Sequence, residues 1–509
     1  METKTAAIEM RNITKRFGPV LANDKVWLNI YRGEILALLG ENGSGKTTLM
    51  NMLSGIYFPD EGEIKIDGKE VVIRSPKDAF DNGIGMIHQH FKLVDVLTAA
   101  ENIVLGLPGK LDLKAASAKI CEICDKYGFS VDPAQKIYDM SVSQKQTVEI
   151  VKVLYRGADI LILDEPTAVL TPQETDKLFA VLRNMRNDGK AIVIITHKMH
   201  EVEALSDRVA ILRHGQFIGD MLTAHTNAQE MTNMMVGHAV SLNIERPDPV
   251  DPKPRIEVKG LTVRSVDGIV KLDDVSFTAN SGEILGIAGI SGCGQKELLE
   301  AIAGLQTVES GSISYIEDDG SCEELIGKDP LSIAELGVSL SFVPEDRLGM
   351  GLVGNMNLAD NMMLRSFRRG KSIFTDRRSP RALAESVVQE LSVSTPSVDT
   401  PVRRLSGGNV QKVLVGREIA SAPTVLLTAY AVRGLDIHSS YTIYDLINRQ
   451  KKAGVAVIFV GEDLDVLLEL CDRILVLCGG KVSGIVSGRG AEKREVGMMM
   501  TKLGGQSHE

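Results

Sequence analysis

Residues 40–48, GENGSGKTT, decide the fold of this chain, because an apolar strand (34–39) precedes them and a helix (46–54) is expected to follow. Glycines at this spacing let the backbone turn its N–H groups toward phosphate oxygens, and the start of the helix adds a favourable dipole. We expect Lys46 to reach the β- and γ-phosphates and Thr47 to ligate Mg²⁺. A plain glycine-rich turn is the alternative, but it would not need strand, loop and helix in this order. The stretch predicts a phosphate-binding loop.

Two carboxylates follow the apolar run 160–163. Asp164, at the end of this expected strand, can hold Mg²⁺ directly or through water. Its neighbour Glu165 is placed to polarise an attacking water molecule. His197 follows the apolar run 191–195, from where it could contact the γ-phosphate. An isolated Asp-Glu pair would more simply be a solvated turn, so the catalytic interpretation depends on the upstream loop.

The composition is that of a globular protein with more than one domain. The chain has 509 residues, of which 44% are hydrophobic and 24% charged, and its formal net charge is −10. The length exceeds what one core supports, and the negative charge argues against a nucleic-acid partner. No apolar run approaches the ~18 residues of a membrane-spanning helix, and residues 1–10 lack the features of a signal peptide. We therefore expect a cytoplasmic chain.

One pattern occurs twice along the chain. The run 33–36, GEIL, and the glycine spacing after it recur from residue 282 onward. Between the copies lies ERPDPVDPKP, whose four prolines cannot continue a helix or donate to a sheet ladder. In each copy, continuous apolar runs alternate with helical patterns, which is typical of parallel strands covered by helices on both faces. The predicted fold class is α/β, with a first domain over 1–244, a linker over 245–255 and a second domain over 256–509.

Together these motifs resemble the ABC ATPase family across nearly the whole chain. The resemblance rests on residues 40–48, Gln89, residues 160–165, Thr196 with His197, and the signature Leu405-Ser406-Gly407-Gly408. It implies two tandem P-loop NTPase domains, each with an antiparallel β part and a helical subdomain beside the parallel sheet. It also implies that two domains close face to face, with ATP between the phosphate loop of one and the signature of the other.

The resemblance also implies a set of ligand residues. Phe17 matches the aromatic residue that stacks on adenine, and Gln89 matches the residue that senses Mg²⁺ and couples to a membrane subunit. The residues implied for ATP are Phe17, Gly40, Glu41, Asn42, Gly43, Ser44, Gly45, Lys46, Thr47, Thr48, Ser406, Gly407 and Gly408. Those implied for Mg²⁺ are Thr47, Gln89 and Asp164, and those implied for catalysis are Glu165, His197 and Gln89.

Tandem ATPase domains on one chain are similar to those of bacterial importers for ribose, galactose and other simple sugars. Residues 88–94, HQHFKLV, and 141–146, SVSQKQ, are most similar to the nucleoside branch of that class. The implied activity is ATP hydrolysis coupled to uptake of a simple sugar or nucleoside. The implied partners are two transmembrane permease subunits and an extracytoplasmic substrate-binding protein, with no nucleic acid. The chain would be a peripheral subunit at the cytoplasmic face of the cell membrane.

The second copy departs from the family pattern where chemistry needs it. The replacements are Gln295 for the loop lysine, Lys296 for the Mg²⁺-binding Ser/Thr, Ala429 and Tyr430 for the two carboxylates, Glu462 for the histidine, and Val266 near the stacking aromatic. A neutral amide cannot offset phosphate charge, alanine cannot ligate a metal, and tyrosine, with an ordinary pKa of ~10, is a poor base at pH 7. This copy nevertheless keeps its signature and an intact Gly434-Leu435-Asp436.

The first copy has the opposite defects. Its signature position reads MSVS (140–143), with neither glycine, and Thr171 replaces the aspartate that follows. The intact elements therefore combine into one complete composite site, and the altered elements combine into the other. Unconnected drift in the two copies is the alternative, but drift would not be expected to spare every element of one site.

Two other classes are alternatives to a transport ATPase. A soluble tandem ABC protein acting on the ribosome would have paired intact sites and a long charged helical linker, whereas this linker is short and proline-rich. A DNA-repair ATPase would need a long coiled-coil insertion, and no sustained heptad pattern occurs. Co-purification of membrane subunits would distinguish the three classes.

Overall fold

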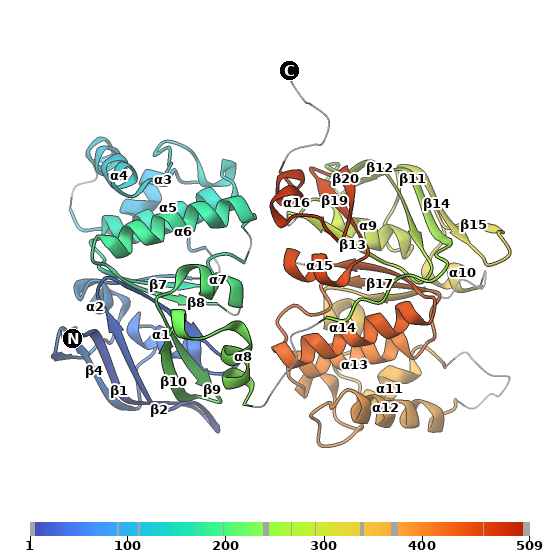
Figure 1. The fold of residues 1–509 in the computed structure, drawn as a ribbon, viewed down its shortest axis with the longest axis horizontal. Coiled ribbons are helices and arrows are strands. Elements are labelled where there is room, and N and C mark those ends of the chain that lie inside the picture. The colour runs from blue at the N-terminus through green and yellow to red at the C-terminus, as the bar shows by residue number, and fades with distance from the viewer. Residues whose placement is uncertain are drawn as a thin grey trace. The chain divides into compact units, whose positions relative to one another are not determined.

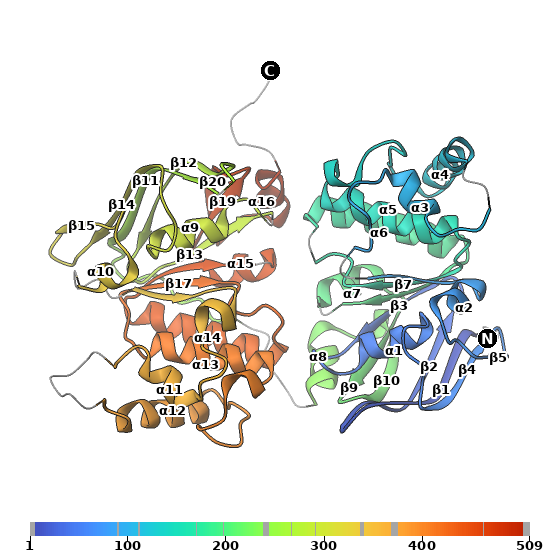
Figure 2. The ribbon, with the colours of Figure 1, turned by 180° about the vertical axis from the view of Figure 1, so that it is seen from behind.

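The computed structural model describes residues 6–88, 91–109, 112–168, 170–196, 198–237, 244–265, 267–290, 292–335, 340–367, 375–461 and 463–501. The chain divides into two units, Met1–Ser241 and Leu242–Glu509 (Figures 1 and 2). Among the described residues, no helix is both long enough and apolar enough to cross a membrane.

A six-stranded sheet organises the first unit, in the order β10-β9-β3-β8-β7-β6. Its strands are β3 (Glu34–Leu39), β6 (Ile84–Ile87), β7 (Ile160–Asp164), β8 (Ala191–Ile195), β9 (Arg208–Arg213) and β10 (Gln216–Leu222). All neighbours pair in parallel except β10, which runs antiparallel to β9. The central strands are buried along their whole length, which explains why they read as continuous apolar runs.

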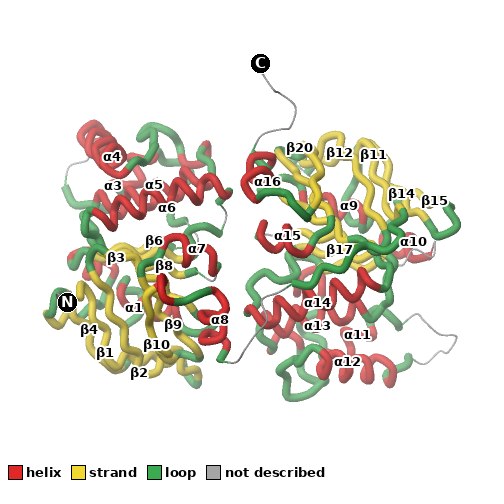
Figure 3. Tube along the Cα trace, in the orientation of Figure 1, coloured by secondary structure: helices red, strands yellow, loops and turns green. Residues whose placement is uncertain are grey.

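An antiparallel sheet and a group of helices cover the two faces of this parallel sheet (Figure 3). The antiparallel strands are β1 (Ala6–Phe17), β2 (Val20–Tyr31), β4 (Glu61–Ile66) and β5 (Lys69–Val71). The helices are α1 (Lys46–Leu53), α2 (Pro76–Asp81), α3 (Ala99–Val104), α4 (Leu113–Tyr127), α5 (Val142–Tyr155), α6 (Pro172–Asn187), α7 (Met199–Leu205) and α8 (Ala228–Val236). One core fills the space between α1 and the two sheets, and a second lies under α5 and α6.

The second unit repeats this architecture. Its six-stranded sheet comprises β16 (Leu340–Val343), β17 (Val425–Ala429), β18 (Ala456–Val460), β13 (Ile284–Gly289), β19 (Arg473–Cys478) and β20 (Lys481–Ser487), in that order. The antiparallel strands are β11 (Pro254–Arg264), β12 (Val270–Asn280), β14 (Ser310–Ile316) and β15 (Cys322–Glu324). The helices are α9 (Gln295–Ile302), α10 (Pro330–Glu335), α11 (Leu358–Met363), α12 (Arg378–Glu390), α13 (Gly407–Ile419), α14 (Ile437–Lys452), α15 (Leu464–Leu470) and α16 (Lys493–Met499).

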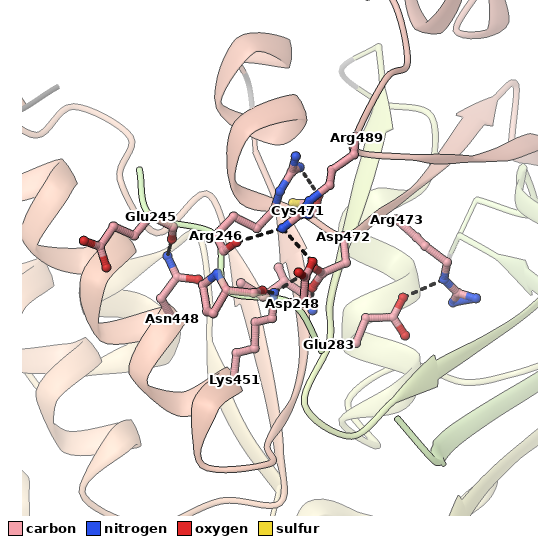
Figure 4. Close-up of polar contacts among 12 residues, drawn as sticks. Glu245, Arg246, Asp248, Glu283, Asn448, Lys451, Cys471, Asp472, Arg473 and Arg489 are labelled. Atoms are coloured by element: carbon pink, nitrogen blue, oxygen red, sulfur yellow. Dashed lines mark hydrogen bonds and ion pairs between the residues drawn. The ribbon is translucent and has the colours of Figure 1, made fainter. Parts of the chain in front are cut away.

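The proline-rich segment packs on the second unit through its backbone carbonyls (Figure 4). Asn448 of α14 donates to the carbonyl of Glu245 at 2.5 Å, and Lys451 donates to that of Pro247. Lys451 also pairs with Asp472 at 2.7 Å, and its side chain is only 1% exposed. The segment therefore lies over a buried ion pair instead of crossing solvent.

Arg246 makes the reciprocal contact in the same segment. Its Nη1 donates to the carbonyls of Leu468 and Cys471, at 2.6 and 2.7 Å, where α15 ends. The last carbonyls of a helix have no partner within the helix, so a cation there both satisfies them and suits the helix dipole. Chain entry into the second unit is thus fixed by polar contacts on both sides.

Candidate functional site

The phosphate loop of the first unit joins β3 to α1 and folds around the side chain of Lys46. Its Nζ donates to the carbonyls of Gly40 and Glu41, at 2.7 and 3.0 Å, and the residue is 8% exposed. Burial lowers the pKa of Lys46, and the charges of Glu165, Asp164 and Glu41 oppose this shift. The loop therefore holds a cation in its interior, as phosphate binding requires. Carboxylates lie near this cation.

Gly45 sets the shape of the loop, and Ser44 offers a hydroxyl that fits a phosphate. Gly45 has a φ of 94°, and a Cβ on it would lie 2.3 Å from the carbonyl oxygen of Ala22, so only glycine suits this position. The Ser44 hydroxyl is buried and has no hydrogen-bond partner among the described residues. Such orphaned groups are uncommon in native proteins, and a phosphate oxygen would satisfy this one.

Asp164 and Thr47 meet at the end of β7. The Thr47 hydroxyl donates to Asp164 Oδ2 at 3.3 Å. Burial, followed by the charge of Glu165, raises the pKa of Asp164, while the Thr47 hydrogen bond and Lys46 lower it. A divalent cation at this point would relieve the cost of two adjacent carboxylates, and a hydroxyl with a carboxylate suits Mg²⁺. The residues present therefore fit Mg²⁺.

Glu165 has a backbone conformation that is unusual for its residue type. Its φ is 47°, in the left-handed region, and its N–H donates to the carbonyl of Ile195 at 2.8 Å. Residues held in this region are found disproportionately at functional sites, because the surrounding structure must stabilise the strain. Glu165 therefore lies at the carboxyl ends of the parallel strands, where the phosphate loop also begins.

Phe17 ends β1 with its side chain open to solvent, at 41% exposure. The ring of Tyr57 meets it edge-on, with the centroids 5.1 Å apart, and Lys15 Nζ lies 5.5 Å from its centroid. Sequence reasoning did not single out Tyr57. Its only signal is that it lies just beyond α1, the helix that begins in the phosphate loop.

A buried carboxylate behind the strand ends was also missed. Glu201 of α7 is 4% exposed and accepts hydrogen bonds from the hydroxyls of Thr167 and Thr196, at 2.5 and 3.2 Å. It thereby ties the segment after β7 to the segment after β8. Four positions identified from the sequence, namely Gln89, His197, Val266 and Glu462, lie outside the described residues.

The second unit keeps the backbone of this site but changes its chemistry. Gly294 has a φ of 99° and α9 begins at Gln295, as α1 begins at Lys46 after Gly45. The Gln295 amide donates back to the carbonyl of Ile290 at 3.2 Å. The cationic group of Lys296 instead pairs along α9 with Glu300, at 3.7 Å. The loop shape thus survives without a lysine in its interior.

Both signature positions lie at the start of a helix. In the second unit, Ser406 caps α13, and its Oγ accepts a hydrogen bond from the side chain of Asn409 at 2.9 Å. In the first unit, Ser141 caps α5 by accepting a hydrogen bond from the backbone N–H of Gln144, but Val142 takes the first helical position that is glycine in the other copy. The structure therefore brings Lys46, Thr47 and Asp164 together in one unit, and residues 406–408 together in the other.

The family profile described as ABC transporter matches residues 23–168 and 272–428. The chain belongs to the ABC transporter family. Membership confirms the predicted fold of two tandem ABC-type domains and the predicted ATPase activity coupled to transport.

Several curated members of the ABC transporter family are similar over the full chain. The nucleoside import ATP-binding protein NupA of Lactococcus lactis subsp. cremoris is 42% identical over 509 residues, covering 99% of each chain. The glucose import ATP-binding protein TsgD13 of Haloferax volcanii is 39% identical, covering 98% of this chain and 96% of its own. The guanosine import ATP-binding protein NupO of Bacillus subtilis is 40% identical, covering 97% of each.

Proposed function

We propose that this ABC protein is the ATP-binding subunit of an importer and hydrolyses ATP at one complete composite site. One observation carries the proposal. The two units have the same backbone conformation at the phosphate loop and at the strand end, yet only the first has Lys46, Asp164 and Glu165 there. The same backbone with catalytic side chains in only one unit points to one hydrolytic site.

Each side chain of the first unit has a distinct part in this proposal. The Lys46 ammonium and the Ser44 hydroxyl bind the phosphates, and Phe17 offers its exposed ring to the adenine. Thr47 and Asp164 would hold Mg²⁺, which neutralises charge on the phosphates when bound. Glu165 accepts a proton from, and so orients, the attacking water. Gln89 and His197 are proposed to assist, from the resemblance alone.

The groups on the other side of the bound ATP are proposed to come from the second unit's signature. The Ser406 hydroxyl and the first N–H groups of α13 would face the γ-phosphate, since these N–H groups have no partner within the helix. Gly407 and Gly408 have no Cβ that would hold the phosphate away.

The cargo is proposed to be a nucleoside or a simple sugar. The names of the relatives, which specify import of nucleosides, guanosine and glucose, support this, and residues 88–94 and 141–146 favour the nucleoside. Two permease subunits and an extracytoplasmic substrate-binding protein would complete the transporter at the cytoplasmic face of the membrane. The ribosomal alternative is disfavoured because the proline-rich segment is packed on the second unit rather than extended as a helix.

The test uses the full chain and one pair of equivalent substitutions. Lys46→Ala should lower ATP hydrolysis by at least ~100-fold, whereas Gln295→Ala should change it little. Equal losses from both would contradict the single hydrolytic site. Affinity purification of the chain from membranes should bring permease subunits with it, and cells carrying Lys46→Ala should lose uptake of guanosine or of ribose. Recovery with ribosomes instead would contradict the importer.

A further inference from the structure

Beside the signature of the second unit, one arginine side chain joins two separate backbone segments. Arg347 begins a short π-helical turn, Arg347–Gly351, just after β16. Its Nη1 donates to the carbonyl of Gly407 at 3.2 Å, and its Nη2 donates to the carbonyl of Arg433. The two carbonyls belong to the start of α13 and to the loop between β17 and α14.

The contact with Gly407 controls a group beyond the carbonyl itself. A peptide unit is planar and trans, so the carbonyl of Gly407 and the N–H of Gly408 share one plane and point in opposite directions. Fixing the oxygen therefore fixes the direction of the N–H. This peptide lies in the first turn of α13, where helix ends fray, and glycine is the residue with the greatest backbone freedom. The contact with Arg347 therefore adds a second restraint to the one that the helix supplies.

Glycine at position 407 also eases the contact. A Cβ on Gly407 would lie 3.2 Å from Arg347 Nη1, so the guanidinium would have to shift by a few tenths of an ångström to accommodate it. The equivalent position of the first unit is Val142, in the signature that has lost both glycines. The contact between the guanidinium and the glycine therefore occurs in the copy that keeps its signature.

The second contact ties the signature to Gly434-Leu435-Asp436. The carbonyl of Arg433 shares its peptide plane with the N–H of Gly434. Gly434 is the first residue of this loop and has a φ of 68°. Asp436 then caps α14. A Cβ on Gly408 would lie 3.6 Å from Leu435 and 3.8 Å from Asp436, so the two segments lie close together. Arg347 holds both segments in one arrangement.

The guanidinium is suited to this task by its charge and its shape. Burial, followed by the charge of Arg433, lowers the pKa of Arg347, but an arginine side chain stays protonated in proteins. Arg433 turns its own side chain away to Glu345 and to the ring of Tyr430, 5.8 Å from the ring centroid. A charged donor makes the stronger hydrogen bond, and the planar fork of arginine can serve two acceptors at fixed geometry.

We infer that Arg347 is a positioning residue for ATP hydrolysis, holding the Gly407–Gly408 peptide so that the Gly408 N–H is aimed at the γ-phosphate. The inference rests on the proposed function, in which this signature faces the nucleotide. Arg347 itself does not touch the phosphate. Its effect is to orient the donor in advance, because a donor fixed before the reaction needs no rearrangement in the transition state.

The experiment compares Arg347→Ala and Arg347→Lys in the full chain, with Arg381→Ala as the control. Arg381 forms an exposed ion pair with Asp399 in the same unit, at 2.7 Å, so its loss should leave activity unchanged. For Arg347→Ala we expect kcat to fall about 10- to 100-fold, with KM for ATP and Tm close to those of the unaltered chain. Arg347→Lys should recover part of the loss, since an ammonium can still donate to one of the carbonyls.

Unaltered kcat in Arg347→Ala would overturn the inference, and so would a loss that follows a matching fall in Tm, because the role would then be structural. Gly408→Asp, measured in parallel, separates this failure from that of the proposed function. If Gly408→Asp abolishes hydrolysis while Arg347→Ala does not, the signature is used and the positioning role alone is wrong. If Gly408→Asp is fully active, the proposed site is wrong and the positioning role falls with it.

Discussion

Glu165 and Tyr430 have the same backbone conformation at the ends of equivalent strands. Their φ angles are 47° and 53°, and their N–H groups donate to the carbonyls of Ile195 and Val460 at 2.8 and 2.9 Å. The strained turn that presents a carboxylate in the first unit therefore persists in the second unit, where it presents a phenol. Strain retained without the carboxylate means that the fold, and not the residue type, sets this conformation.

Replacing Glu165 by glutamine should separate ATP binding from hydrolysis. The amide keeps the shape of the side chain but cannot accept the proton of the attacking water. We expect ATP to bind with nearly unchanged affinity and to accumulate unhydrolysed, with turnover down by at least ~100-fold. Equilibrium binding and steady-state phosphate release measure the two effects. Tyr430→Phe is the matched control and should turn over normally; normal turnover in Glu165→Gln as well would mean that another group polarises the water.

Deleting the Asp164 charge should stabilise the first unit in a pH-dependent way. The pKa of Asp164 is raised in the folded state, chiefly by burial, so the folded state binds this proton more tightly than the unfolded state does. Stability then falls as the pH rises from the unfolded to the folded pKa, and the penalty is fully present above the folded pKa. Asp164→Asn should raise Tm at pH 7 without nucleotide, by an amount that shrinks on acidification, and should abolish ATP hydrolysis. A Tm gain that is the same at all pH values would contradict burial of the charge as its cause.

The residues of the phosphate loop could be predicted because their information is local. Gly45, Lys46 and Thr47 are set by a short pattern that needs a strand before it and a helix after it. The apolar runs likewise predicted the central strands, since burial on both faces leaves no polar positions. The antiparallel part and the signature were assigned by resemblance, because neither has a comparable pattern within one copy.

The features that were not predicted depend on contacts between distant segments. Arg347 reaches Gly407 and Arg433 only after three loops of the second unit come together, and nothing around Arg347 in the sequence marks it. Glu201 similarly acquires its role from Thr167, on another loop. A sequence pattern reports local geometry, whereas these partners are chosen by the packing of the whole unit.

Arg246 should stabilise the second unit although it lies in the proline-rich segment. Arg246→Ala removes the donor to the carbonyls of Leu468 and Cys471 at the end of α15. Hydrogen bonds from a charged donor to such groups contribute about 1.5–3 kcal/mol, so we expect a loss of about 2 kcal/mol. Denaturant unfolding, with hydrogen exchange followed at α15, measures it.

Arg489→Ala is the control for Arg246→Ala, because Arg489 contacts the same proline-rich segment from an exposed position. Arg489 pairs with Asp248 at 2.6 Å and donates to the carbonyl of Arg246 at 3.0 Å, but its side chain is 53% exposed, and exposed pairs contribute roughly 0–1 kcal/mol. Its removal should therefore change the unfolding free energy by less than that of Arg246. Equal effects of the two substitutions would show that the carbonyl contacts at α15 are not what holds the segment.

The two signature positions should respond unequally to the same substitution. Gly408→Asp adds bulk and a negative charge where the proposed site holds the γ-phosphate, and the new Cβ would lie 3.8 Å from Asp436 Oδ2. We expect turnover to fall by at least ~100-fold, while weak ATP binding through Lys46 and Phe17 survives, because the first unit is untouched. Ser143→Asp makes the matching change in the first unit's altered signature and should cost much less. Steady-state ATPase activity and ATP binding are measured for both variants. If Ser143→Asp abolishes activity and Gly408→Asp is harmless, the pairing of the first unit's phosphate loop with the second unit's signature is wrong, and each unit must complete its own site.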